Sequence, residues 1–167
     1  MANYGYVKVK AASDIEGSCT DKNFEKQMVV YKFDMNCFFD FDNVQGRTTS
    51  NQHGSPVGFV IRLDESAPEL LKAFRKANPC EVLWTIVDKD KNGAQVPIFT
   101  IKLINARIVK WNVYTPHTKD PATQVLDHSL EISFSYEQVD VTAEKWDSTS
   151  KGHPKKMDTF KFREPTA

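Results

Sequence analysis

The sequence lacks a long apolar segment, and its positive and negative charges cancel. It contains no stretch of about 18 apolar residues, the length that a membrane-spanning helix needs. Its first residues also lack the basic region and apolar run of a secretory signal peptide. Lys and Arg together number 22, as do Asp and Glu, whereas nucleic-acid-binding domains usually carry a basic excess. We therefore expect no membrane span, no nucleic-acid partner and synthesis in the cytoplasm without a signal peptide.

Cysteine and glycine are scarce, and the common catalytic motifs are missing. The three cysteines, Cys19, Cys37 and Cys80, are odd in number and widely spaced, so they suggest neither a disulfide framework nor a metal site. The chain has no GxSxG, GxxxxGK[ST] or GxGxxG motif. No catalytic residue, cofactor or metal ligand is therefore predicted, and we expect a protein that is not an enzyme. The four histidines all lie in polar tracts without metal-ligand spacing: His53, His117, His128 and His153.

The strongest pattern present is apolar residues at every second position from Val29 to Phe41. A period of two is typical of a strand, because successive side chains point to opposite faces. Thirteen residues at about 3.3 Å each would span roughly 43 Å, which exceeds a typical strand. We expect this segment to bend, to contain a bulge, or to project from the body as an arm. The apolar members are Val29, Tyr31, Phe33, Met35, Cys37, Phe39 and Phe41.

Further alternating segments predict half-buried antiparallel strands. They run over 57–63 and 130–136, with shorter versions at 7–10 and 159–163 that we expect to be edge strands at the two ends. Between Phe99 and Val113 the apolar phase switches twice, after Leu103 and after Ile108. Phase switches require bulges or sharp bends, which curl a sheet into a barrel. The sequence therefore favours a closed or two-sheet barrel over a flat sheet.

Only one segment has the chemistry of a helix. Ser66 to Glu69 matches a capping box with Pro68 in the first turn, and apolar residues follow at helical spacing until Asn78-Pro79. We thus predict a mainly β protein: a two-sheet antiparallel β-barrel or sandwich with one connecting α-helix at about residues 67–77. The whole chain, residues 1–167, is predicted to form a single domain.

Two acidic segments are candidates for functional sites. Asp88 to Gly93 matches the first half of a calcium loop, but the twelfth position is Phe99 rather than Glu, and Asn92-Gly93 between two strand-like runs favours a hairpin turn. Asp40 and Asp42 could form a carboxylate pair for acid–base chemistry. Beside a polar tract, solvation or ion pairing is the favoured interpretation.

The polar tract from Asn43 to Pro56 is long for a loop in a compact domain, and loops of this length are usually functional. It continues from the overlong strand. It is either a solvated loop or an arm that contacts a neighbouring subunit through polar contacts. The residues alone leave these two interpretations equal.

Several ordered landmarks together resemble a known family. These are Asp14-Ile-Glu-Gly-Ser18 with Asp21, Leu63-Asp-Glu-Ser-Ala-Pro-Glu-Leu70, Ile101-Lys-Leu103, and Leu130-Glu131 through Tyr136-Glu-Gln-Val139. From about Val7 to Val141 the chain resembles the Hcp family, the tube protein of bacterial type VI secretion, although Val141 and the tail with Trp146 depart from the Trp-rich ending of many relatives.

The resemblance implies a two-sheet barrel whose copies form a tube. Six copies would close into a ring, and rings would stack into a hollow tube that a contractile sheath expels, capped by a VgrG-type spike and able to carry small effector proteins in its lumen. Secretion would then need no signal peptide. The resemblance also raises the arm above the solvated loop, with a subunit or ring interface formed by Asp40, Asp42, Gln45, Gly46, Arg47, Thr48, Thr49, Ser50, Asn51, Gln52 and His53.

The alternative function is a β-barrel that binds a small molecule without catalysis, because barrels of about eight strands can hold one apolar ligand. Such a protein needs an internal cavity. The large side chains of Trp84, Trp111 and many Phe residues are sufficient to fill one.

Overall fold

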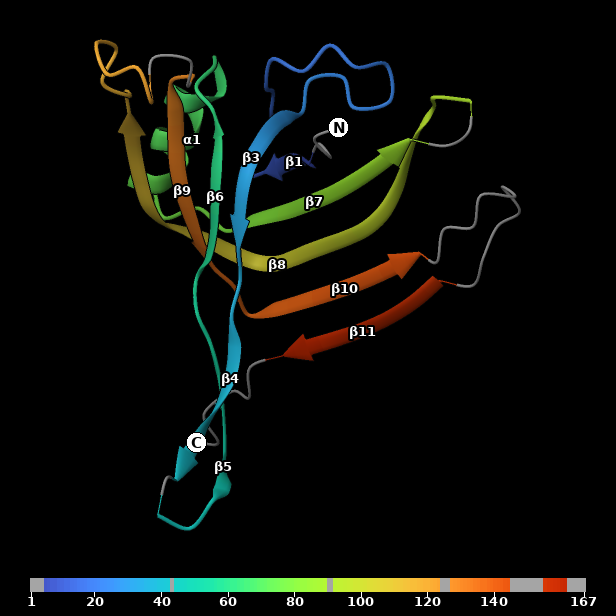
Figure 1. Ribbon diagram of the computed structural model, residues 1–167, viewed down its shortest axis with the longest axis vertical. Helices are drawn as coiled ribbons and strands as arrows, with labels where there is room; N and C mark the ends of the chain where they lie inside the picture. Colours follow the sequence, from blue (N-terminus) through green and yellow to red (C-terminus); the bar gives the residue numbers. More distant parts are fainter. Residues whose placement is uncertain (1–4, 43, 90–91, 124–126, 145–154, 162–167) are drawn as a thin grey trace.

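The structure, a computed structural model, describes residues 5–42, 44–89, 92–123, 127–144 and 155–161. These residues form eleven strands and one helix (Figure 1). In chain order the elements are β1 (Gly5–Lys10), β2 (Asp14–Ile15), β3 (Met28–Asp34), β4 (Cys37–Asp42), β5 (Arg47–Gly54), β6 (Val57–Arg62), α1 (Ser66–Arg75), β7 (Cys80–Lys89), β8 (Gln95–Tyr114), β9 (Ser129–Ser135), β10 (Gln138–Glu144) and β11 (Lys155–Lys161).

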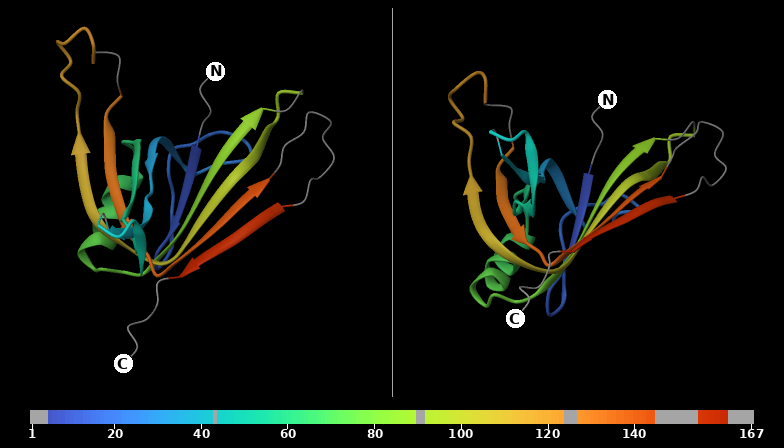
Figure 2. Two further views of the ribbon diagram at one scale, coloured as in Figure 1. Left: turned by 60° about the horizontal axis from the view of Figure 1, so that its bottom comes forward. Right: turned by 90° about the horizontal axis from the view of Figure 1, so that it is seen from below.

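Six antiparallel strands close into a barrel in the order β8-β7-β1-β3-β6-β9, and β9 pairs back onto β8. Seen from below, β7, β10, β11 and the first half of β8 form one wall, and β3, β6, β9 and the second half of β8 form the other (Figure 2). This confirms the mainly β barrel with one helix. The expected N-terminal edge strand is wrong, because β1 pairs with both β3 and β7. The expected C-terminal edge strand is confirmed, because β11 lies at the edge of the sheet.

Two bulges bend β8 so that it belongs to both walls. At the first, Ile104 and Asn105 together lie opposite Glu81, and Asn105 has a φ of 50°. At the second, Ile108 pairs with Phe134 and Lys110 pairs with Ser133, so Val109 is the inserted residue. The two bulges coincide with the two predicted phase switches. After the first, Ala106 and Ile108 face the interior; after the second, Trp111 is half-buried, while Val109 and Val113 are exposed.

The start of β3 departs from the predicted alternation. A bulge at Tyr31 interrupts the pairing of β3 with β6, so that Met28 and Val30 face the core before it and Phe33 does so after it. Val29 instead packs on the outside, and Tyr31 is exposed. Of the predicted bend, bulge or projecting arm, the bulge is therefore present in β3, but the expectation that Val29 and Tyr31 share the buried face is wrong.

The helix α1 lies against the second half of β8 and buries Ala67, Leu70 and Ala73. The indole Nε1 of Trp111 donates to the carbonyl of Ala67 at 3.3 Å. The predicted capping box does not form, because the buried Ser66 hydroxyl donates to Asp64 instead of capping the helix. The helix ends at Arg75 rather than at residue 77, where Ala77 adopts a φ of 48°.

The segment of residues 16–27, which we name the covering loop, packs over the outer face of β1 and β7. Tyr6 stacks on Phe24 with ring centroids 4.4 Å apart, and both join Cys19 and Val87 in a second small core. At the start of β1 both faces are therefore covered, with Val7 in the main core and Tyr6 under the covering loop, whereas Lys8 and Lys10 are exposed further along the strand.

The predicted hairpin turn and the closing strand are both present. β7 and β8 pair as antiparallel neighbours on either side of Asn92-Gly93, where Gly93 has a φ of 78°; Asp90 lies outside the described residues. At the other end, Phe160 of β11 is opposite Val139 of β10 and packs against the main core. Trp146 and Phe162 lie outside the described residues.

Candidate functional site

The β4–β5 hairpin leaves the barrel as a separate two-stranded sheet (Figure 1). In the described part of the chain, β4 and β5 pair with each other and with no other strand. The polar tract after Asp42 is therefore not a loop as predicted, because β5 occupies most of it. The projecting arm is confirmed, with the correction that it is a hairpin.

The hairpin continues directly from the β3–β6 pair of the barrel. The last pair on the barrel joins Asp34 to Gly58. Beyond it, the Ser55 N–H donates to the Asn36 carbonyl at 2.9 Å, and the Asn36 N–H donates to the Ser55 hydroxyl at 3.2 Å. These bonds hold the two strands together at the root, so the arm begins at a fixed position on the barrel.

One contact joins the root to the end of β9. Cys37 Sγ lies 4.0 Å from the Tyr136 hydroxyl. Burial, with the neighbouring Cys37, raises the pKa of Tyr136 to about 12. The tyrosine is therefore neutral throughout the physiological range and marks where the arm meets the barrel.

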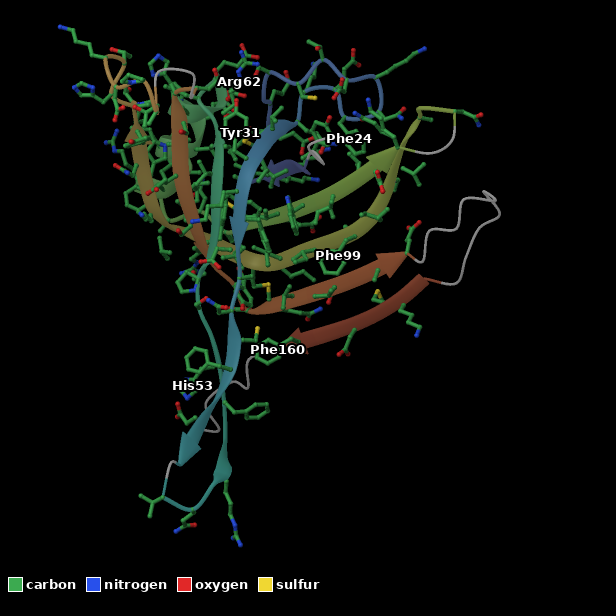
Figure 3. The ribbon with its side chains drawn as sticks, in the orientation of Figure 1. Phe24, Tyr31, His53, Arg62, Phe99 and Phe160 are labelled. Atoms are coloured by element: carbon green, nitrogen blue, oxygen red, sulfur yellow. The ribbon has the colours of Figure 1, made fainter. Side chains whose placement is uncertain are left out.

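Aromatic side chains are exposed on the arm. Phe38 is 52% exposed and Phe39 is 49% exposed, and because they are adjacent in a strand they point to opposite faces. The imidazole of His53 stacks on Phe38 with ring centroids 5.4 Å apart (Figure 3). Its Nε2 lies 2.8 Å from Asp40 Oδ2. In the described part of the arm, exposed rings therefore lie beside the polar groups of His53 and Asp40, a combination that is common in protein interfaces.

The predicted interface residues all lie on this arm. Asp40 and His53 contact each other, which supports ion pairing over acid–base chemistry for Asp40. Gln45 and Gly46 lie in the turn, where Gly46 has a φ of 63° that favours glycine. The other predicted residues lie on its strands, with Arg47 paired to Asp42 in register; the side chains of Asp42, Thr48, Thr49, Ser50, Asn51 and Gln52 lie outside what the structure describes.

Two apolar residues of the arm escaped the sequence analysis. Phe38 occupies a polar position of the alternating run, and Val44 stands in the turn with 94% of its surface exposed. An apolar residue out of phase is the signal that could have identified Phe38 as an exposed contact residue.

The sequence landmarks form structural contacts around the covering loop. Asp64 accepts hydrogen bonds from the N–H groups of Ser18 and Ser66, each at 2.9 Å, which joins the loop to the start of α1. Asp21 accepts from the Tyr6 hydroxyl, and Gln95 Nε2 donates to that hydroxyl at 3.1 Å. Burial and the Asp21 carboxylate raise the pKa of Tyr6 to about 12.

The described residues offer no group of three or more His, Cys, Asp or Glu that could hold a metal ion. No helix in the described part of the chain is both long and apolar enough to cross a bilayer. Aromatic rings pack across the barrel interior, with Phe33 stacked on Trp84 at 3.8 Å and Phe59 edge-on to Phe134 at 5.9 Å. Such packing is how a barrel of this size fills its interior.

A charged cluster lies on the barrel surface formed by β3, β6, β8 and β9, beside a cavity of about 170 Å³. Glu131 accepts from Lys110 Nζ at 2.8 Å and from Asn112 Nδ2 at 3.3 Å, and these bonds lower its pKa. The cluster satisfies its own charges. It therefore resembles an ordinary ion-paired strand surface more than a reaction centre.

The fold and the site together are a six-stranded antiparallel barrel with aromatic rings packed across its interior and a projecting hairpin that exposes Phe38 and Phe39. The family model described as "Type VI secretion system effector, Hcp" matches residues 6–142. The chain therefore belongs to the Hcp family of type VI secretion, as the landmarks indicated. No curated protein matches the sequence.

Solved structures of Hcp proteins share the fold. One, described as an Hcp protein, has a TM-score of 0.83 at 18% identity and covers 98% of this chain and 99% of its own. A mutant of Hcp1 from E. coli EAEC 042 has a TM-score of 0.77 at 23% identity, with 94% and 98% covered. Hcp3 of Pseudomonas aeruginosa has a TM-score of 0.68 at 17% identity, with 98% and 100% covered.

Proposed function

We propose that this protein is a tube subunit of a type VI secretion system and acts by assembling with copies of itself, not by catalysis. Six copies would close into a ring, and rings would stack into a hollow tube. The observation that carries this proposal is the β4–β5 arm, whose Phe38 and Phe39 are exposed because the barrel does not cover them. A large exposed ring on a projecting element is stabilised when a neighbouring molecule covers it.

The contacts between copies would be of the head-to-tail kind. The arm is one surface, and its receptor on the next copy is a different surface, so the interface is heterologous and closes into a ring when the rotation per copy fits. A formal charge of zero on the chain removes long-range repulsion between identical copies, which favours this assembly.

The tube would act together with other components of the secretion machine. We propose that a contractile sheath surrounds it, that a VgrG-type spike caps it, and that small effector proteins can travel in its lumen. The subunit would be made in the cytoplasm and leave the cell by this route without a signal peptide. Family membership supports these proposals, and each requires its own binding or secretion assay.

Light scattering coupled to size exclusion tests the assembly directly. At tens of micromolar the protein should elute as a species of several subunits, and negative-stain images should show rings. A strict monomer without rings would overturn the proposal.

A pair of matched variants tests the arm. Replacing Phe38 and Phe39 by Ser should reduce the assembled fraction at least tenfold, because the variant lacks the rings that the neighbouring copy would cover. Tyr114→Ser removes a ring of similar exposure, 50%, at the end of β8 and should leave assembly unchanged. The far-ultraviolet circular dichroism of both variants should match that of the unsubstituted protein, because none of the substituted residues belongs to the barrel core. Equal loss of assembly in the two variants would contradict the special role of the arm.

A further inference from the structure

A second concave site lies on the barrel away from the arm, between α1 and the β1–β2 turn. It has a volume of about 180 Å³. Its floor is apolar, formed by Ala11, Ile15 and Ala73, and the latter two are buried. Lys72 and Lys76 stand at its rim. The site is open to solvent on one side, and its volume is sufficient for one small apolar side chain.

The tip of the arm presents a side chain of that kind. Val44 is 94% exposed, the highest value among the large apolar residues that the structure describes as exposed. It stands at the end of the hairpin, between β4 and β5. A valine at the end of a two-stranded arm can enter a cavity without the arm having to bend.

The charges around the two surfaces are complementary. The arm carries two carboxylates, Asp40 and Asp42, against the single Arg47. The cavity is lined by two cations, Lys72 and Lys76, and one carboxylate, Glu69, and Arg75 adds a third positive charge in the last turn of α1. Opposite charges around a small apolar contact guide the partners and fix their orientation.

The arm and the cavity cannot meet within one chain. The arm extends from one end of the molecule, whereas α1 lies in the other half, behind the barrel wall (Figures 1 and 2). Only a second copy can therefore bring a tip to a cavity, and each copy would give its tip to one neighbour and receive the tip of another.

We propose that Val44 at the arm tip of one copy docks into the cavity between α1 and the β1–β2 turn of the next copy. This inference rests on the proposed assembly and adds the receptor surface to it. The occupant is a second copy of this chain, and the contact repeats in one direction from copy to copy.

Disulfide trapping tests the contact. In a Cys37→Ser background, which removes the exposed native thiol while Cys19 and Cys80 stay buried, we would combine Val44→Cys with Ser13→Cys at the cavity. Cysteines join only when their Cβ atoms come within about 4.5 Å. Mild oxidation of the assembled protein should give a ladder of trimers and longer chains on non-reducing gels, which a reductant removes. Either single variant can give at most a dimer.

The matched control carries Val44→Cys with Ser133→Cys, which makes the same Ser-to-Cys change at the cavity beside the charged cluster. It should give no ladder. A second test is Ala12→Trp in the trapping variant, which fills the cavity from its exposed rim and should reduce the ladder at least tenfold.

The outcomes separate the inference from the proposed function. Assembly by light scattering without a ladder above the control would overturn the inference alone. A ladder that survives Ala12→Trp would also overturn it. A protein that remains monomeric would overturn both, whereas a ladder restricted to the cavity variant supports both.

Discussion

The barrel and the arm are built from the same strand geometry but use their side chains in opposite ways. In the barrel, alternate residues such as Leu103 and Phe134 are fully buried and their neighbours face solvent. On the arm, Phe38 and Phe39 on opposite faces are both half exposed. Burial inside one chain stabilises that chain, whereas the exposed rings of the arm would stabilise the proposed contact with another copy. The comparison predicts that stability and assembly can be changed separately.

The largest effect on stability is expected in the barrel. Leu103→Ala should lower the free energy of unfolding by about 2–5 kcal/mol, because it leaves a cavity in a fully buried site. Phe39→Ala on the arm should change it by less than about 0.5 kcal/mol while it weakens assembly. Urea unfolding at a concentration where the protein is dissociated measures both. If Phe39→Ala lowered the free energy of unfolding by more than about 2 kcal/mol, the arm would contribute to the stability of the single chain, contrary to the comparison.

Two glycines, one in the covering loop and one in the arm, extend the comparison with a smaller expected effect. A Cβ on Gly17 would lie 2.6 Å from the carbonyl oxygen of Gln27, so Gly17→Ala must displace backbone and should cost about 3 kcal/mol. A Cβ on Gly46 would meet nothing within 4 Å, and only its φ of 63° opposes alanine, at a cost of about 1 kcal/mol. Thermal unfolding of the two variants should rank them in this order. The reverse order would show that the turn of the arm, not the covering loop, limits stability.

Alkaline pH should affect the barrel through Tyr6. Its pKa in the folded chain is about 12 and its ordinary value is 10. Below pH 10 both states hold the proton and the stabilisation is complete; between pH 10 and 12 the unfolded chain releases the proton first, so stability falls as pH rises. Tyr6→Phe should lower stability by about 1 kcal/mol at neutral pH and flatten this fall.

Part of the alkaline fall should remain in Tyr6→Phe. Burial also raises the pKa values of Tyr136, Cys19 and Cys80, with the same sign. Urea titrations at pH 8 to 11.5 measure the slope. An unchanged slope would show that Tyr6 does not release its proton on unfolding in this range.

The smallest effect is expected from the His53–Asp40 pair. Both side chains are about half exposed, and exposed ion pairs contribute about 1 kcal/mol or less. His53→Gln should therefore leave unfolding within about 0.5 kcal/mol of the unsubstituted protein. A loss above 1 kcal/mol by urea unfolding would mean that the pair supports the arm itself.

The sequence predicted those features that depend on local pattern. Both phase switches in β8 became bulges, because an apolar side chain must change its position in the alternation when a strand crosses from one wall to the other. The helix followed from apolar spacing around Leu70. The projecting arm was one outcome predicted from the length of the run ending at Phe41, since a strand that long exceeds what one wall of a barrel needs.

Features that depend on distant partners were not predictable. The length of the run predicted a bulge among other outcomes, but nothing in the sequence places it at Tyr31, because the apolar pattern continues through that residue. The predicted capping box does not form, because the Ser66 hydroxyl donates its hydrogen bond to the Asp64 carboxylate. The strand β5 is not predictable, because its residues lack an alternation of apolar and polar side chains and only the pairing with β4 makes it a strand. β1 was taken for an edge because its partners lie far along the chain.

The closing pair of the barrel also sets a limit on when the protein can fold during synthesis. β9 joins both β6 and the second half of β8, and it begins only at Ser129. Until the ribosome has released that strand, β6 and the bent half of β8 are both open edges, and open edges invite pairing with other chains. The barrel must therefore close late and quickly, and a delay in making β9 would expose its two partner strands to aggregation before any ordered assembly could begin.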